Sequence, residues 1–376
     1  MTRAVELAQV ASLGVSEAFK NRIINGGMVI DQRFAGAAMT FSQNPTYCID
    51  RWATFIGNGT GGIVNTAQGV GVGLEGFRRA LLITTTTGGT LSGNDYKLIG
   101  QVIEGSNYAD LDYGTSSAKT ATLSFWVFTS VAGNYTINLS NANAFNRNYS
   151  AVYNIPAVNT WTKITLTIPG DTTGTWVSDN SNGGLRILFS LGASGTVASS
   201  TITPGWGTTA PLWQTTGAAN FLGTTGAIFY ITGVQFEVGT QATSFEYRPY
   251  GTELALCQRY FCKSSSTNVV ATNNSGLATG MFSSGVINTY GSNAAYGNWI
   301  KYPVTMRTEA TTITFINTNL PSPGTSGQWS VYNGSAWLNT TSLNAQSSTT
   351  EGFNTVLAFS GTTFMYYGAW TSSAEL

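Results

Sequence analysis

Two carboxylates, Asp110 and Asp112, are the first candidates for chemistry in this sequence. In an extended segment, residues two apart share one face and lie about 7 Å apart along the strand. That separation is compatible with an inverting glycosidase, in which two carboxyl groups flank the glycosidic bond. The same pair also suits turn capping, the simplest interpretation, or a structural Ca²⁺ held by oxygen ligands. Because turn capping is favoured, we predict no catalytic residue and no metal site.

The residues that other common catalytic, metal and phosphate sites require are missing from the sequence. The sequence contains no histidine, the commonest general base and metal ligand, so Ser-His-Asp and Cys-His arrangements are impossible. The three cysteines, Cys48, Cys257 and Cys262, are odd in number and lack metal-type spacing, which predicts buried thiols in a protein made in a reducing cytosol. The glycine-rich run 69–73 is followed by no helix and no phosphate-binding lysine, so it predicts a turn. We therefore predict a protein that is not an enzyme and needs no cofactor.

Aromatic residues are the stronger candidates for a ligand site. Sugar rings stack their C–H faces on tryptophan and tyrosine, while nearby amides and hydroxyls bond the sugar hydroxyls. Two groups lie in Asn- and Gly-rich segments near the end of the chain, and they give the candidate carbohydrate-binding residues Trp329, Tyr332, Trp337, Tyr290, Tyr296 and Trp299. Trp206 and Trp213 mark a long loop over residues 192–225. For any single ring, burial in a core or an interface is the simpler role.

Composition limits the partners. Of 376 residues only 9% are charged, with 17 basic and 17 acidic, so no basic surface is expected to track nucleic acid or an anionic membrane. No apolar run approaches the ~20 residues of a membrane helix, and Met1–Lys20 lacks the pattern of a secretory signal. Hydrophobic residues make up 42% and aromatic residues 12%, enough for packed cores. We predict a folded protein with no nucleic-acid partner and no membrane insertion.

The elements that must position these residues are mostly strands. In the clearest strand pattern, Leu123, Phe125 and Val127 share one face, while Trp126 and Phe128 share the other. Many short patterns of this kind, separated by Gly and Asn turns, indicate antiparallel sandwiches. Large apolar side chains on both faces of a strand must be buried on both faces, but a single sandwich buries only the inner face of each sheet. This predicts a closed symmetric oligomer.

A helical pattern at Tyr247–Cys262 divides the strand patterns into two groups. Thr252 is its expected N-cap, Glu253 puts negative charge in the first turn, and apolar residues follow at helical spacing. The fold class predicted is all-β, with two antiparallel, jelly-roll-like β-sandwich domains, 21–246 and 263–376, joined by this helical brace at 247–262. Residues 1–20 carry an apolar stripe too short to fold alone, which predicts a helical attachment segment.

Several motifs together resemble those of phage tail-fibre and virion appendage proteins. They are NRIINGGMVIDQR at 21–33, IDRW at 49–52, ITGVQFEVG at 231–239, FEYRPYGTELALCQRY at 245–260, YPVTMR at 302–307 and WTSSAEL at 370–376. The resemblance implies a virion structural protein with a jelly-roll fold like that of a carbohydrate-binding module, usually trimeric. It names no sugar-binding residue, so no site is carried over.

The resulting functional prediction is a non-enzymatic phage virion protein, a tail fibre or appendage located on the particle and synthesised in the host cytoplasm. We expect a homotrimer that attaches to other virion proteins through residues 1–20 and binds host cell-surface polysaccharide with its C-terminal sandwich. One alternative is a capsid decoration protein on the head, without receptor binding. A polysaccharide depolymerase is less favoured, because histidine and a parallel β-helix repeat are both missing.

Overall fold

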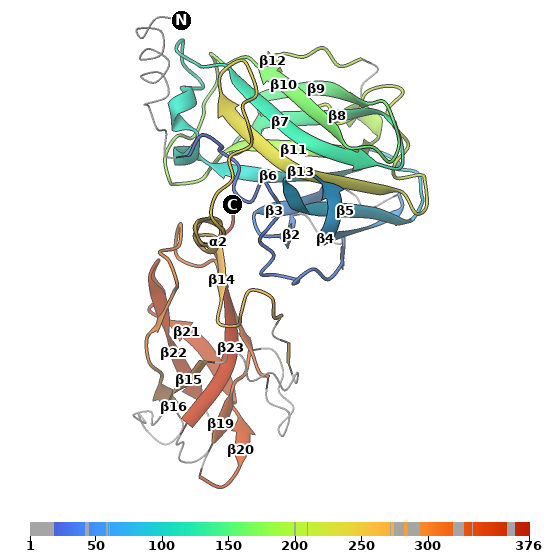
Figure 1. Ribbon diagram of the computed structural model, residues 1–376. Helices are drawn as coiled ribbons and strands as arrows, with labels where there is room; N and C mark the ends of the chain where they lie inside the picture. The colour runs from blue at the N-terminus through green and yellow to red at the C-terminus, as the bar shows by residue number, and fades with distance from the viewer. Residues whose placement is uncertain are drawn as a thin grey trace, which may run out of the picture.

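The computed structural model describes residues 19–41, 45–57, 59, 61–198, 201–208, 210–270, 272–273, 282–284, 294–318, 327–332, 334–358 and 365–376. Every strand pair among them is antiparallel, and the strands form four sheets that stack into two sandwiches (Figure 1). The prediction of an all-β fold of antiparallel sandwiches is therefore confirmed. The helical attachment segment expected at 1–20 lies, except for its last two residues, outside the described residues.

The first sandwich consists of two large sheets. Sheet A has the order β1 (Met39–Thr40), β4 (Ile63–Leu74), β5 (Phe77–Thr87), β13 (Ile228–Val238), β7 (Ala121–Thr129) and β10 (Thr162–Ile168). Sheet B has the order β12 (Trp206–Gly207), β9 (Asn148–Ile155), β8 (Gly133–Asn141), β11 (Gly183–Ala193), β6 (Tyr96–Glu104), β3 (Trp52–Ile56) and β2 (Thr46–Ile49). Strands distant in sequence are neighbours in both sheets, so residues from across this part of the chain meet on one face.

The alternation in β7 places its side chains as predicted. Leu123, Phe125 and Val127 are fully buried between the two sheets. The Phe125 ring meets Phe189 of sheet B edge-on at 4.9 Å between centroids. Burying one such side chain contributes about 1.5–3 kcal/mol, so this face is what holds the sheets together. The opposite face of β7, with Trp126 half-buried, points away from the core.

The second sandwich is smaller. One sheet has the order β14 (Phe261–Lys263), β23 (Met365–Ser373), β19 (Ser330–Tyr332) and β20 (Trp337–Asn339), with β15 (Phe282–Ser284) and β18 (Thr312–Ile316) also paired to β23. The other has the order β16 (Ala294–Tyr296), β22 (Gly352–Ala358) and β17 (Ile300–Lys301), with β21 (Ser342–Gln346) paired to β22. Phe353 of the smaller sheet packs on Phe315 and Trp370 of the larger one, at 6.0 and 5.5 Å between ring centroids.

Short helices mark the connections. Three 3-10 helices, η1 (Gly105–Asn107), η2 (Ala109–Leu111) and η3 (Gly195–Val197), lie in the first sandwich, and α2 (Tyr250–Gln258) lies between the sandwiches. The expected N-cap at Thr252 is wrong, because the helix begins earlier and its N-cap is Pro249, whose carbonyl accepts the first bond from the Glu253 amide at 3.1 Å. The helix packs Cys257 against Ile24 and Ile30. No helix in the described part of the chain is long and apolar enough to span a membrane.

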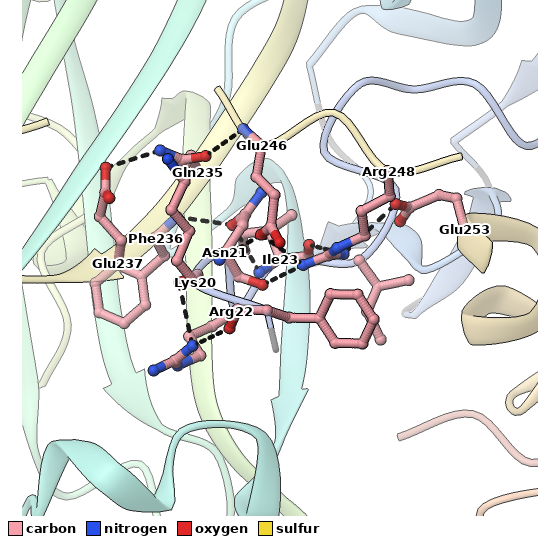
Figure 2. Close-up of polar contacts among 12 residues, drawn as sticks. Lys20, Asn21, Arg22, Ile23, Gln235, Phe236, Glu237, Glu246, Arg248 and Glu253 are labelled. Carbon is pink, nitrogen blue, oxygen red and sulfur yellow. Dashed lines mark hydrogen bonds and ion pairs between the residues drawn. The ribbon is translucent and has the colours of Figure 1, made fainter. Parts of the chain in front are cut away.

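Residues 20–25 are fastened to the end of β13 by buried polar groups (Figure 2). The Asn21 side chain donates to the Val234 carbonyl at 3.0 Å and accepts from the Phe236 amide at 3.0 Å. The Asn21 amide donates to Glu246 Oε2 at 2.8 Å, and Glu253 of α2 accepts from the Asn25 amide. Residues 20–25 therefore have a structural role, since their polar groups are hydrogen-bonded within the fold.

The last residues return to the first sandwich. The Ala374 amide donates to the Tyr260 carbonyl at 2.8 Å, and the Leu376 carbonyl accepts from the Tyr47 hydroxyl at 2.8 Å. The Glu375 carboxylate pairs with Arg33 and with the fully buried Arg51. The two sandwiches are thus connected twice, through α2 and β14 and again through the end of β23 (Figure 1).

The three cysteines are free and buried, as predicted. Burial raises the pKa of Cys48 to about 12, so its thiol stays protonated at neutral pH. Protonated buried thiols behave as small apolar groups, which agrees with a packing role.

Candidate ligand-binding surfaces

The structure places the two candidate carboxylates in a tight turn rather than in an extended segment. Asp110 belongs to η2, and Asp112 ends that helix in the left-handed conformation with φ 54°. Asp110 pairs with Arg22 at 2.5 Å, and Asp112 lies 3.4 Å from Lys119. The expectation of a shared strand face is wrong, because the short helix turns the two side chains toward different cations. Among the described residues, no three His, Cys, Asp or Glu side chains come together as a metal site.

Trp329 is the clearest correction among the candidate sugar-binding residues. It is fully buried, stacked on Tyr366 at 5.6 Å and edge-on to Phe315 at 5.3 Å. Its indole N–H donates to the Ala369 carbonyl at 3.0 Å. The ring therefore offers no face to a ligand and serves the core of the second sandwich.

Two other candidates, Tyr332 and Trp337, meet on the outer face of the same sheet. They are opposite each other across β19 and β20, with ring centroids 5.2 Å apart. Tyr367 of β23 joins them, edge-on to Trp337 at 4.5 Å. All three side chains are partly exposed, and we call Tyr332, Trp337 and Tyr367 the ring cluster. Tyr367 was not among the candidates predicted from the sequence, since only the pairing of β19 with β23 brings it close to the other two rings.

Uncharged polar groups adjoin the ring cluster. Ser330 is opposite both Asn339 and Tyr367 in the sheet. The Ser330 hydroxyl donates to Asn317 Oδ1 at 2.9 Å, and the Asn317 amide donates to Asn339 Oδ1 at 2.7 Å. This network fixes the Asn339 amide, half-exposed, beside the rings. In Figure 1, β19 and β20 lie at the end of the second sandwich remote from the first.

The remaining candidates are not brought to the ring cluster by any described contact. Trp299 is 42% exposed and lies against Gly352, next to β17. Tyr296 ends β16, and Tyr290 lies outside the described residues. In the long loop, Trp206 packs edge-on against Trp176 at 5.3 Å, and its indole N–H donates to the Pro169 carbonyl at 2.7 Å.

The outer face of sheet A carries Trp126 and Phe128, which were expected to need cover in an oligomer, together with further rings. Phe128 lies opposite Tyr230 across β7 and β13, with centroids 5.7 Å apart, and contacts Trp161 at 5.6 Å. Gly233, at φ 61°, lets Phe77 and Trp126 close over it, because an added Cβ would lie 2.6 Å from the first and 3.1 Å from the second. We call Phe77, Trp126, Phe128, Trp161 and Tyr230 the aromatic strip. All five are partly buried, and Phe77 also contacts the Phe245 and Tyr247 rings at 5.1 and 5.6 Å between centroids.

Comparisons with known proteins were made by sequence and by fold. No family model and no curated protein matches the sequence. Among solved structures, the enzymatically active domain of tailspike protein 4 of bacteriophage CBA120 has a TM-score of 0.29 and 14% identity over 58% of this chain and 22% of that one. A family 4 carbohydrate-binding module has a TM-score of 0.29 and 18% identity, covering 57% and 98% of the two chains. The family 11 carbohydrate-binding module of a Clostridium thermocellum cellulosomal cellulase has a TM-score of 0.28 and 12% identity, covering 54% and 99%.

The chain thus spans about a fifth of the tailspike domain that it matches. Likeness at these scores carries no argument about ligand or activity. The class of the fold, a protein of antiparallel β-sandwiches, follows from the strand pairing of the chain itself.

Proposed function

We propose that this chain is a non-enzymatic phage virion protein that binds a glycan of the host surface through its second sandwich. The observation that carries the proposal is the ring cluster, in which three half-exposed rings from β19, β20 and β23 form one surface. Exposed rings that gather on one face mark binding sites more often than single exposed rings do.

The chemistry of the surface favours a neutral sugar. Ring faces take the C–H faces of a sugar, and Asn339, whose Oδ1 accepts from the Asn317 amide, is an uncharged polar neighbour of the rings. Tyr367 is paired in the sheet with Ser330 and Ser283, and Tyr332 is paired with Met365. Asn339 is paired with Ser330, and none of these four residues carries a charge. A neutral glycan can therefore bind here without removing water from a charged side chain of this surface.

The phage assignment is supported by the motif resemblance over residues 21–376. It also leads to a proposal for how copies of the chain assemble with one another and with the virion. We assign the aromatic strip to contacts between copies in a homotrimer, and residues 1–20 to attachment to another virion protein. A face of half-buried rings is the kind of surface that oligomer interfaces cover. Light scattering should give three times the chain mass, and Phe128→Lys should reduce it. A monomer mass for the unchanged chain at micromolar concentration would oppose the trimer.

The test of glycan binding compares Trp337→Ala with a matched control. The control is Tyr250→Ala, which removes a ring that is 54% exposed on α2, outside the second sandwich. On a glycan array of host surface polysaccharide, we expect Trp337→Ala to lose about five- to thirtyfold in apparent affinity and the control to match the wild type, since stacking on one ring is worth about 1–2 kcal/mol.

Two outcomes separate the alternatives. Absence of glycan binding by the unchanged chain would favour the capsid decoration protein without receptor binding. A cleared zone on a polysaccharide gel would favour the depolymerase, and we expect none.

A further inference from the structure

A second candidate site lies on the other sandwich, under the loop that follows β11. Residues 212–219 of this loop cover the outer face of sheet B. The Leu212 carbonyl accepts from the Ser150 hydroxyl at 2.8 Å, the Trp213 amide donates to the Val197 carbonyl at 2.8 Å, and the Ala219 amide donates to the Asn134 carbonyl at 2.9 Å. The covered face is that of β8 and β11.

Three polar groups under this loop are buried without any partner in the described part of the chain. They are the hydroxyl of Thr136 on β8, the hydroxyl of Ser190 on β11 and the indole N–H of Trp213. Their residues are 1%, 5% and 9% exposed. Burying a polar group without a hydrogen bond costs about 1–3 kcal/mol, so three such groups together are a substantial cost in this place.

All three residues line the same small cavity. Its volume is about 10 Å³, enough for about one water molecule. An adjoining cavity of about 170 Å³ reaches past Leu91 and Leu222. The two cavities share five lining residues, which are Leu191, Gly192, Gln214, Ala218 and Ala219.

Gln214 is the one long polar side chain common to both cavities. Its Oε1 accepts from the Ala193 amide at 2.5 Å. A ligand that fills the larger cavity and reaches the three unpartnered groups needs the Gln214 side chain to move aside, which breaks its bond to the Ala193 amide.

The joined cavity specifies a ligand by size and by polarity. At about 170 Å³ the larger part is well below the roughly 300–1,000 Å³ of pockets for drug-sized molecules, and suits about one sugar ring. Among the described residues that line the two cavities, none is charged. Two hydroxyls that donate and accept, and one N–H that donates, match the hydroxyl groups of a neutral polyol.

We infer that this cavity binds a single neutral sugar residue end-on, with its hydroxyls on Thr136, Ser190 and Trp213. The deep end is closed by sheet B, so a sugar within a long chain does not fit and a terminal or free monosaccharide does. The site is separate from the ring cluster and does not depend on glycan binding there.

The test uses the full-length protein and free monosaccharides. Saturation-transfer NMR would measure binding of D-glucose, D-galactose, D-mannose, L-fucose and N-acetyl-D-glucosamine, with D-glucuronate as the charged counterpart. We expect saturable binding of at least one neutral sugar and none of glucuronate. Failure of every neutral sugar to bind would overturn the inference.

The decisive variant is the near-isosteric double change Thr136→Val and Ser190→Ala, with exposed Thr165→Val on β10 as the matched control. The double variant should weaken sugar binding about tenfold or more and raise Tm, because two unpartnered polar groups are removed from the interior. Unchanged binding would overturn the inference, and so would a fall in Tm, which would mean that ordered water already satisfies the groups. Trp337→Ala should leave this binding unchanged, so the two sites succeed or fail separately.

Discussion

Replacing Glu375 by alanine should destabilise the protein, because it breaks a buried ion pair near the end of the chain. Its carboxylate pairs with Arg33 and Arg51, and the side chains of Glu375 and Arg51 are 7% and 1% exposed. Removing one partner of a buried ion pair costs about 3–5 kcal/mol, because the other charge stays buried. Arg51 keeps the Val102 carbonyl and lies 3.6 Å from the Tyr260 ring centroid, so we expect the lower end, about 3 kcal/mol.

The assay is urea unfolding followed by tryptophan fluorescence and circular dichroism. A free energy is derived where the two transitions coincide. Glu309→Ala, which removes an exposed carboxylate, is the matched control and should stay within about 0.5 kcal/mol of the wild type. The paired change Arg51→Met with Glu375→Leu should recover much of the loss, since apolar replacement of a buried pair is often neutral. A Glu375→Ala protein as stable as the control would refute the reasoning.

Three further predictions concern other parts of the chain. Gly233→Ala should cost at least about 1 kcal/mol in urea unfolding, because its φ of 61° disfavours alanine and the new Cβ would meet the Phe77 ring. Burial raises the pKa of Asp50 to about 6, so between about pH 4 and 6 the native state keeps a proton that the unfolded state releases. The unfolding free energy should therefore fall by about 3 kcal/mol as pH rises from about 4 to 6. Urea titrations across that range would measure the fall, and a flat profile would oppose it. Deletion of residues 1–18 should leave circular dichroism and solubility unchanged yet abolish incorporation into virions, and normal occupancy by gel and electron microscopy would oppose the attachment role.

Local alternation predicted which side chains face the core but not which strands are neighbours. Period-two spacing in β7 assigned Phe125 to one face and Trp126 to the other, and the structure confirms both. The insertion of β13 between β5 and β7 joins segments about a hundred residues or more apart, and nothing local in the sequence encodes it. From the sequence, the aromatic strip could therefore be predicted only as apolar side chains on β7 that another surface must bury.

The candidate sites show the same limit. Tyr332 and Trp337 are joined by a short turn, so their proximity follows from the sequence, whereas Tyr367 reaches them only through β23. Trp329 has the same residue type and a similar neighbourhood in the sequence, yet it lies on the inner face. Thr136 and Ser190 are ordinary residues in a chain rich in hydroxyls, and only their burial without partners distinguishes them.

The double connection between the sandwiches has a mechanical consequence. β14 and the end of β23 are antiparallel neighbours, with Phe261 opposite Ser373, so that β14 leads away from the first sandwich and β23 leads back to it. Tension applied at the far end of the second sandwich is divided between two paths, the covalent chain through α2 and the contacts of residues 374–376. Because two connections share the force, rotation of one sandwich relative to the other is more restricted than a single linker would allow. In the role proposed above, a pull on the ring cluster would reach the first sandwich through both paths.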